Sequence, residues 1–184
     1  MAKTVETYWE LIEPYWEVIN IYDGPEAFEA SIRGAPRPVI LLYSAHFCVS
    51  EVRNGGFLQF FMNSTGVLAP EAIEAFSAIG MPTLAALVNN AAETLGTAYP
   101  RNRGDRRDAL LVASGHSQTE LEEIFSKYGN ESDASKGSYR AFVKATEKLP
   151  FESLQRQFWH AAKTENGGFE EAATRFANVP HLIQ

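Results

Sequence analysis

Residues 51–66 read Glu51-Val-Arg-Asn-Gly-Gly-Phe-Leu-Gln-Phe-Phe-Met-Asn-Ser-Thr-Gly66 and are the most informative stretch of this chain. The paired glycines in its middle allow positive φ, so they predict a sharp change of direction at the end of one helix. In the helix that follows, Phe57, Phe60 and Phe61 are spaced i, i+3 and i+4 and share one face. The closing Asn-Ser-Thr-Gly run is typical of a second helix end. The stretch therefore predicts a corner between two core helices.

The polar side chains of this stretch have two interpretations. In the first, they satisfy backbone groups that the turn leaves exposed, as polar side chains near helix ends commonly do. In the second, they line the pocket of a small α-helical ligand-binding domain or enzyme. Both interpretations use the same residues, namely Glu51, Asn54, Gly55, Gly56, Gln59 and Asn63. The glycine pair is not followed by the Gly-Lys-Ser/Thr of a phosphate-binding loop.

The same stretch resembles the signature of a bacterial all-helical family, the DNA-mimic protein 19 family. The family pattern joins a helix ending in Glu-Val-x-Asn-Gly-Gly-Phe to a helix reading Gln-Phe-Phe-x-Asn-Ser-x-Gly. This chain has all of those residues within 51–66, and the likeness extends over roughly residues 5 to 128. The resemblance implies a homodimeric DNA mimic that occupies the DNA-binding surface of a transcription regulator or another basic protein. A shared fold does not by itself determine the function.

The composition is that of an ordinary globular protein. The chain has 184 residues, of which 45% are hydrophobic and 21% charged, so one domain with its own core is expected. No basic segment followed by an apolar one begins the sequence, and the most apolar run, residues 39–49, is too short to span a bilayer. Cys48 stands alone in that run, which favours a buried thiol in a reducing compartment. We therefore expect a cytoplasmic protein.

The hydrophobic pattern predicts an all-α fold, a single compact domain of eight to ten helices with no sheet of consequence. Pro14 is expected to kink or split the first helix, and Ser117 or Thr119 to cap the helix that ends before residue 129. The expected helices span residues 4–21, 25–31, 38–53, 56–63, 70–79, 82–95, 105–113, 117–128, 138–148, 151–164 and 168–177.

One helical domain is expected over residues 1–184. Residues 129–137 are small and polar and are predicted to form a linker. This linker divides a family-like core at residues 1–128 from a C-terminal helical extension at residues 138–184.

Charge is distributed unevenly along the chain. The net charge is −7, from 16 basic and 23 acidic residues. Residues 1–32 hold seven acids against Lys3 and contribute −6, whereas the sixteen acids and fifteen bases that follow contribute −1. This asymmetry favours a basic partner over nucleic acid as the ligand.

The acidic residues near the N-terminus form the candidate phosphate-mimicking surface. On an α-helix over residues 4–21, the first four would lie within about 40° of one another on the helical wheel, opposite an apolar face. Their axial spacing of roughly 4.5 to 6 Å resembles the interval between phosphates on one DNA strand. Four carboxylates over ~16 Å supply much less charge than duplex DNA, so a mimic needs further acids and a second subunit. The expected partner-binding residues are Glu6, Glu10, Glu13, Glu17, Asp23, Glu26 and Glu29.

One basic cluster stands out in the sequence, between residues 101 and 107. Asp105 and Asp108 are interleaved with it, so we expect a solvated loop or an intramolecular ion-pair network and no direct contact with nucleic acid. Its members are Arg101, Arg103, Arg106 and Arg107.

No catalytic or metal-binding pattern is found in the sequence. The histidines at 46, 116, 160 and 181 lack metal-ligand spacing, and there are no paired cysteines. We therefore expect a non-enzymatic acidic interaction protein with no cofactor, metal or membrane contact, and a basic DNA-binding protein as its partner. Two alternatives stay open: the ligand-binding domain or enzyme described above, and a scaffold or immunity-type partner without mimicry. Without mimicry, the acidic residues near the N-terminus form an ordinary solvated helix face.

Overall fold

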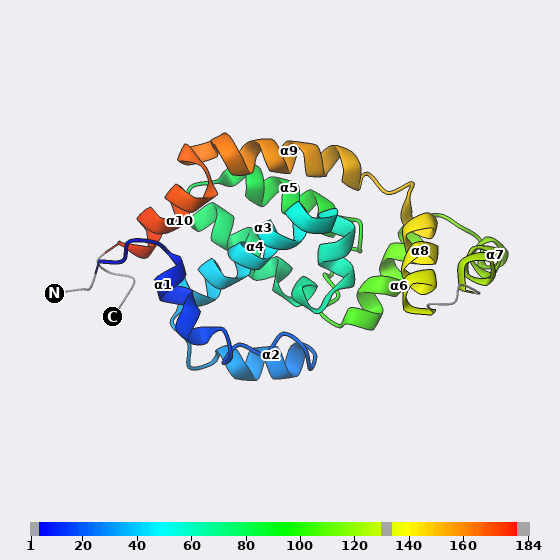
Figure 1. The fold of residues 1–184 in the computed structure, drawn as a ribbon, viewed down its shortest axis with the longest axis horizontal. Coiled ribbons are helices and arrows are strands. Elements are labelled where there is room, and N and C mark those ends of the chain that lie inside the picture. The colour runs from blue at the N-terminus through cyan, green and yellow to red at the C-terminus, as the bar shows by residue number, and fades with distance from the viewer. Residues whose placement is uncertain (1–3, 130–133, 180–184) are drawn as a thin grey trace.

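The computed structural model describes residues 4–129 and 134–179, and within these ranges every regular element is a helix (Figure 1). The predicted all-α class is therefore confirmed. The α-helices are α1 (Trp9–Ile12), α2 (Pro25–Ile32), α3 (Arg37–Met62), α4 (Ala69–Ala78), α5 (Pro82–Glu93), α6 (Arg103–Ala113), α7 (Gln118–Gly129), α8 (Ala134–Thr146), α9 (Phe151–Thr164) and α10 (Phe169–Ala177). Short 3-10 helices are η1 (Glu13–Tyr15), η2 (Ser64–Leu68) and η3 (Glu165–Gly167).

Helix α3 runs through the middle of the molecule, and α1, α4, α6 and α9 pack against it. Residues 38–45 are buried without interruption, because their side chains are apolar on all faces of the helix. The one polar side chain in that run, Ser44, donates its hydroxyl hydrogen bond to the Ile40 carbonyl at 2.8 Å. A helix that is apolar all round needs neighbours on every side, which explains its central position.

Helix α3 changes direction at the glycine pair, as predicted. Gly55 has φ −148° and ψ 17°, and Gly56 has φ 76° and ψ −176°, so the α-helical hydrogen-bond pattern is interrupted there. The positive φ of Gly56 is a conformation that residues with a Cβ rarely adopt, and a Cβ there would also require the Gln155 side chain of α9 to move. The break redirects the last two turns of α3.

The three phenylalanines beyond the break are completely buried. The ring of Phe57 meets that of Phe158 on α9 edge-on, with 5.4 Å between centroids, and Phe61 lies 5.8 Å from Phe151. The helices of the predicted C-terminal extension thus share one core with α3.

The predicted linker at residues 129–137 is shorter than expected. Helix α7 ends at Gly129 and α8 already begins at Ala134; residues 130–133 lie outside the described ranges. Helix α7 packs mainly on α8, and α8 packs on α6, so these three helices form the end of the molecule at the right of Figure 1.

The predicted split at Pro14 is confirmed, and the segment over residues 4–21 contains less helix than expected. Helix α1 makes a single turn and continues as the 3-10 helix η1, in which Pro14 occupies the first turn. Proline has no N–H to donate and its ring clashes with the preceding turn, so an α-helix does not continue through it. The apolar side of the segment is nevertheless buried, since Ile12 and Ile19 are both in the core.

Candidate functional site

The polar residues of the signature stretch are drawn together by Glu51. Its Oε2 accepts hydrogen bonds from Nε2 of Gln59 at 2.8 Å and from Nδ2 of Asn63 at 3.0 Å. These bonds join the helix before the glycine break to the helix after it. The three side chains satisfy one another, which favours a structural role over ligand binding.

Asn54 does not belong to this group, so the predicted four-residue pocket does not assemble. Its side chain is exposed, and it lies beside a different cavity of about 180 Å³ near Tyr8 and His46. The Tyr8 hydroxyl and Nδ1 of His46 are 2.9 Å apart. Burial raises the pKa of Tyr8 and lowers the pKa of His46, so both rings are neutral near pH 7.

Arg106 is the most deeply buried charged side chain of the described residues and caps the C-terminal end of α3. Its guanidinium donates to the carbonyl of Phe61 at 2.8 Å, to the carbonyl of Asn63 at 2.7 Å and to the carbonyl of Arg101. The last carbonyls of a helix have no partner within it and form the negative end of its dipole, so a buried cation is favourable there. Desolvation by burial lowers the pKa of Arg106, yet the group stays charged.

Arg103 and Arg101 bind the same corner. Nε of Arg103 donates to the Met62 carbonyl at 2.8 Å. Arg101 forms a two-bond ion pair with Glu71, at 2.7 and 3.0 Å, and also donates to the Val67 carbonyl. The predicted ion-pair network is thus found at Arg101 only.

Gly66 is the last residue of the signature stretch, and its lack of a side chain leaves room for Arg106. A Cβ there would lie 2.6 Å from Nε of Arg106 and 2.9 Å from the Phe60 carbonyl oxygen. The hydroxyl of Tyr99 donates to the Gly66 carbonyl at 2.7 Å. Sequence reasoning did not connect the arginines with this helix end. The signal was present, since a helix that stops in the middle of the chain leaves carbonyls that need donors.

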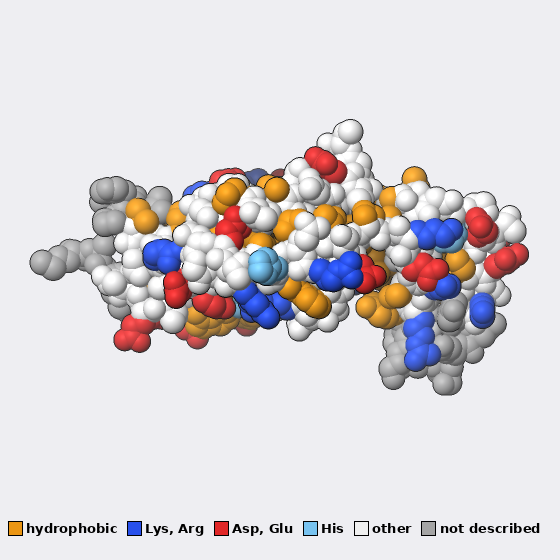
Figure 2. Space-filling view, turned by 90° about the horizontal axis from the view of Figure 1, so that it is seen from above, with side chains coloured by type: hydrophobic (Ala, Val, Ile, Leu, Met, Phe, Trp, Pro, Cys, Tyr) orange, Lys and Arg blue, Asp and Glu red, His pale blue; other side chains and the backbone are white. Residues whose placement is uncertain are grey.

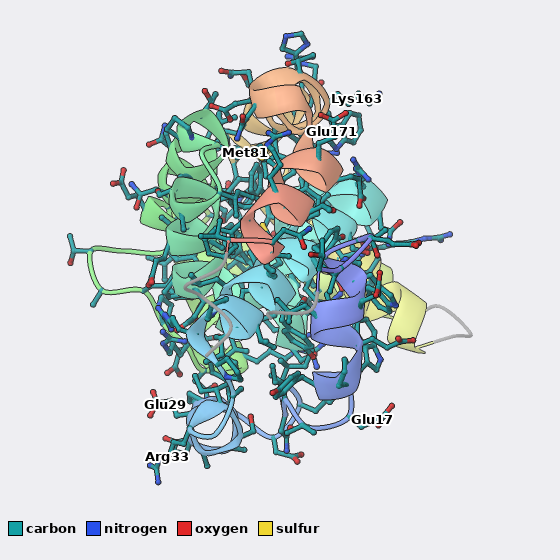
Figure 3. All side chains as sticks on the ribbon, turned by 90° about the vertical axis from the view of Figure 1, so that its left-hand side faces the viewer. Glu17, Glu29, Arg33, Met81, Lys163 and Glu171 are labelled. Carbon is teal, nitrogen blue, oxygen red and sulfur yellow. The ribbon has the colours of Figure 1, made fainter. Side chains whose placement is uncertain are left out.

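The seven carboxylates at residues 6–29 all lie on the surface, and we call them the acidic face. They do not form one straight stripe, because the helix that would align them is broken at Pro14. One of them, Glu10, accepts hydrogen bonds from the backbone N–H of Glu6 at 2.8 Å and of Thr7 at 3.2 Å. Figure 3 shows Glu17 and Glu29 on opposite sides of the molecule's lower end, both pointing away from its body.

No member of the acidic face forms an ion pair with a lysine or arginine in the described ranges. Many acids of the rest of the chain do have basic neighbours. Figure 2 views the side that carries α9, where red and blue side chains lie next to one another. The pairs are Arg37–Glu74, Arg101–Glu71, His116–Glu120, Lys144–Glu147, Arg156–Glu152 and Arg175–Glu171. The acidic face therefore keeps its negative charge.

Large apolar side chains are exposed among these carboxylates. Trp16 is 38% exposed, Val18 54% and Tyr22 78%, and all three lie within the acidic segment. Trp16 stacks on Phe47 of α3 with ring centroids 4.8 Å apart, and it lies 5.2 Å from the Trp9 ring. The acidic face thus combines negative charge with a fixed aromatic ring.

The described residues offer neither a metal site nor a reactive thiol. No group of three or more His, Cys, Asp or Glu side chains is placed to hold a metal ion there. Cys48 is fully buried, and burial raises the pKa of its thiol, which opposes thiolate formation. No helix in the described ranges has both the length and the apolar character that crossing a membrane requires.

The fold and the corner together define an all-helical protein in which a kinked central helix is capped by the buried Arg106. A family model described as DMP19-like protein matches residues 33–146, more than half of the chain, and the protein belongs to that family. The match includes the signature stretch, the arginine segment and α8, and it begins after the acidic face. No curated protein and no solved structure matches the chain.

Proposed function

We propose that this chain is a non-enzymatic interaction protein that acts in the cytoplasm as a DNA mimic. Its acidic face occupies the DNA-binding surface of a basic protein such as a transcription regulator. The observation that carries this proposal is the set of seven exposed carboxylates without a lysine or arginine partner in the described part of the chain. The family match does not cover these residues, so the proposal depends on their exposure and charge.

In this proposal the carboxylates take the place of DNA phosphates. An arginine on the partner binds a carboxylate with two parallel hydrogen bonds, which adds geometric specificity to simple attraction. The acids extend over α1, η1 and α2, so they are spread over that end of the molecule and do not form a single row of charges. Association is then fast at low salt and weakens as salt increases, because exposed charges are screened over about 10 Å at 0.1 M.

The exposed apolar residues favour a protein as the partner. Trp16, Val18 and Tyr22 offer surface that gains free energy when another folded surface covers it. Aromatic residues are enriched among those that contribute most to protein–protein binding. A homodimer would bring together the acidic faces of two chains and increase the density of negative charge.

The experiment compares two variants with the same change in net charge. In the face variant, Glu13, Glu17, Glu26 and Glu29 are changed to Gln; Glu10 is kept because it accepts the backbone N–H groups of Glu6 and Thr7. In the matched control, four exposed acids that are already paired, Glu74, Glu147, Glu152 and Glu171, are changed to Gln.

Each immobilised chain is exposed to lysate of the source organism and then washed with excess duplex DNA. We expect the wild type and the control to retain a basic protein that DNA releases, and the face variant to lose it. Equal capture by the face variant, or the lack of any protein that DNA displaces, contradicts the proposal. Circular dichroism establishes that all three chains are folded, and sedimentation equilibrium tests the homodimer.

A further inference from the structure

A second surface feature lies far from the acidic face, where α6, α7 and α8 meet the end of α3. It is a cavity of about 320 Å³. Helices α6, α7 and α8 are grouped at the right-hand end of Figure 1, whereas α1 and α2 lie at the left and the bottom. The cavity is lined by Met62, Asn63, Arg103, Arg107, Phe125, Ser138, Tyr139 and Phe142. All of these residues are within the range that the family model matches.

One wall of the cavity is cationic. Arg103 and Arg107 are four residues apart on α6, so their side chains lie one turn apart on the same side of the helix. Arg103 uses Nε on the Met62 carbonyl, and its two terminal nitrogens make no hydrogen bond to the part of the chain that the structure describes. Neither arginine forms an ion pair with a carboxylate in the described ranges, and the interleaved Asp105 and Asp108 do not pair with them.

Arg107 has an unfilled hydrogen-bonding requirement. Its Nε is buried and has no hydrogen-bond partner among the described residues. Desolvation and the nearby charge of Arg103 both lower the pKa of Arg107. A buried donor without an acceptor is unfavourable, and two guanidinium groups without a counter-charge repel each other. A bound anion between the two arginines would supply the counter-charge that they lack in the described ranges.

The opposite wall is aromatic. Phe125 of α7 and Tyr139 and Phe142 of α8 line it, and Phe142 is buried whereas Tyr139 is 47% exposed. Such a wall favours a ligand with an apolar ring, since aromatic rings pack at centroid distances of ~4.5–7 Å. The volume is near the lower end of the ~300–1,000 Å³ that ligand pockets have, which suits a ligand with one ring.

We propose that this cavity binds a small organic anion in which a carboxylate or a phosphate is attached to an aromatic ring. The acid group lies between Arg103 and Arg107 and accepts hydrogen bonds from their terminal nitrogens. The ring packs against Phe142 and Tyr139. This site is independent of the acidic face, and either can be lost without the other.

Four probes separate the contributions of charge and ring. Isothermal titration calorimetry of the full chain, at constant ionic strength, uses phenylacetate, phenyl phosphate, inorganic phosphate and 2-phenylethanol. We expect saturable 1:1 binding of at least one aromatic acid, at least tenfold weaker binding of inorganic phosphate, and no measurable binding of the neutral alcohol. The better of the two aromatic acids identifies the acid group that the site prefers.

The variants test the assigned residues. Arg107→Gln is expected to weaken binding of the aromatic acid at least tenfold, whereas Arg156→Gln, an exposed arginine of α9, leaves it unchanged. The amide NMR spectrum of the wild type gives a test that needs no variant, since ligand should shift signals of residues 103–107 and 138–142. The proposal is overturned if neither aromatic acid binds, if the alcohol binds equally well, if Arg107→Gln binds normally, or if the shifted signals lie elsewhere.

Discussion

The acidic face and the arginine segment are both short clusters of like charge, but the structure uses them in opposite ways. The seven carboxylates of residues 6–29 point into solvent and have no basic partner in the described ranges. In the segment of residues 101–107, Arg103 and Arg106 bind backbone carbonyls at the end of α3, and Arg101 pairs with Glu71. A charge cluster in a sequence therefore does not say whether it serves a partner or the chain itself.

The difference follows from what each side chain can bind. A guanidinium has five donors on a long apolar stem, so it can reach the unpaired carbonyls of a helix end while its stem packs in the core. A carboxylate only accepts, and buried N–H donors are scarce because helices use most of them internally. The acids of a short surface segment therefore stay in water unless a partner supplies cations.

The largest effect is expected for Arg106→Met. This change leaves the carbonyls of Phe61 and Asn63 buried without a charged donor, so we expect a loss of ~3–5 kcal/mol in the free energy of unfolding. Urea denaturation measures it. Arg156→Met on the surface of α9 is the control and should change stability by less than ~0.5 kcal/mol. Equal stability of Arg106→Met and the wild type would show that the cap is not needed.

A smaller loss is expected for Glu71→Gln, which breaks the partly buried pair with Arg101. The Glu71 side chain is 9% exposed, so removing its charge leaves a poorly solvated guanidinium and costs ~2–3 kcal/mol. The matched control is Glu74→Gln on the same helix, whose pair with Arg37 is about half exposed and worth less than ~1 kcal/mol. The same denaturation experiment compares them, and equal losses would refute the ranking by burial.

Gly66→Ala tests why the signature stretch ends in a glycine. The new Cβ would approach Arg106 and the Phe60 carbonyl too closely, so the cap must shift at a cost of ~1–2 kcal/mol. Gly34→Ala is the control, since nothing lies within 4 Å of a Cβ at that position. Thermal melts of the two variants are compared, and a Gly66→Ala protein as stable as the control would remove the steric argument.

The smallest effect on stability is expected for the acidic face. Changing Glu13, Glu17, Glu26 and Glu29 to Gln should alter the free energy of unfolding by less than ~0.5 kcal/mol, because these side chains are exposed and unpaired. The change should be towards higher stability at low salt, where removal of like charge matters most. A loss of more than 1 kcal/mol on chemical denaturation would mean that the face has a structural role.

Local sequence patterns were sufficient for most helices. The glycine break in α3 was predicted from residues 55 and 56, and the N-cap of α7 is Ser117, whose N–H donates to Glu120 at 2.7 Å. The predictions that differ from the structure concern two segments. At residues 4–21 the split at Pro14 was predicted, but the apolar period suggested more helix than the single turn of α1 and the 3-10 helix η1. At Ala134 the small polar residues suggested a linker, although they lie within α8.

The sequence by itself determined the all-helical class, the corner in α3, the burial of the phenylalanines and the concentration of negative charge before residue 32. These features depend on periodicity, backbone freedom and composition, which are local properties of the sequence. Tertiary structure alone decided that Glu51 holds Gln59 and Asn63 but not Asn54. It also decided that Arg106 closes the end of α3, some forty residues earlier in the chain. Such contacts depend on which polar groups, in side chains or in the backbone, folding brings within reach of one another.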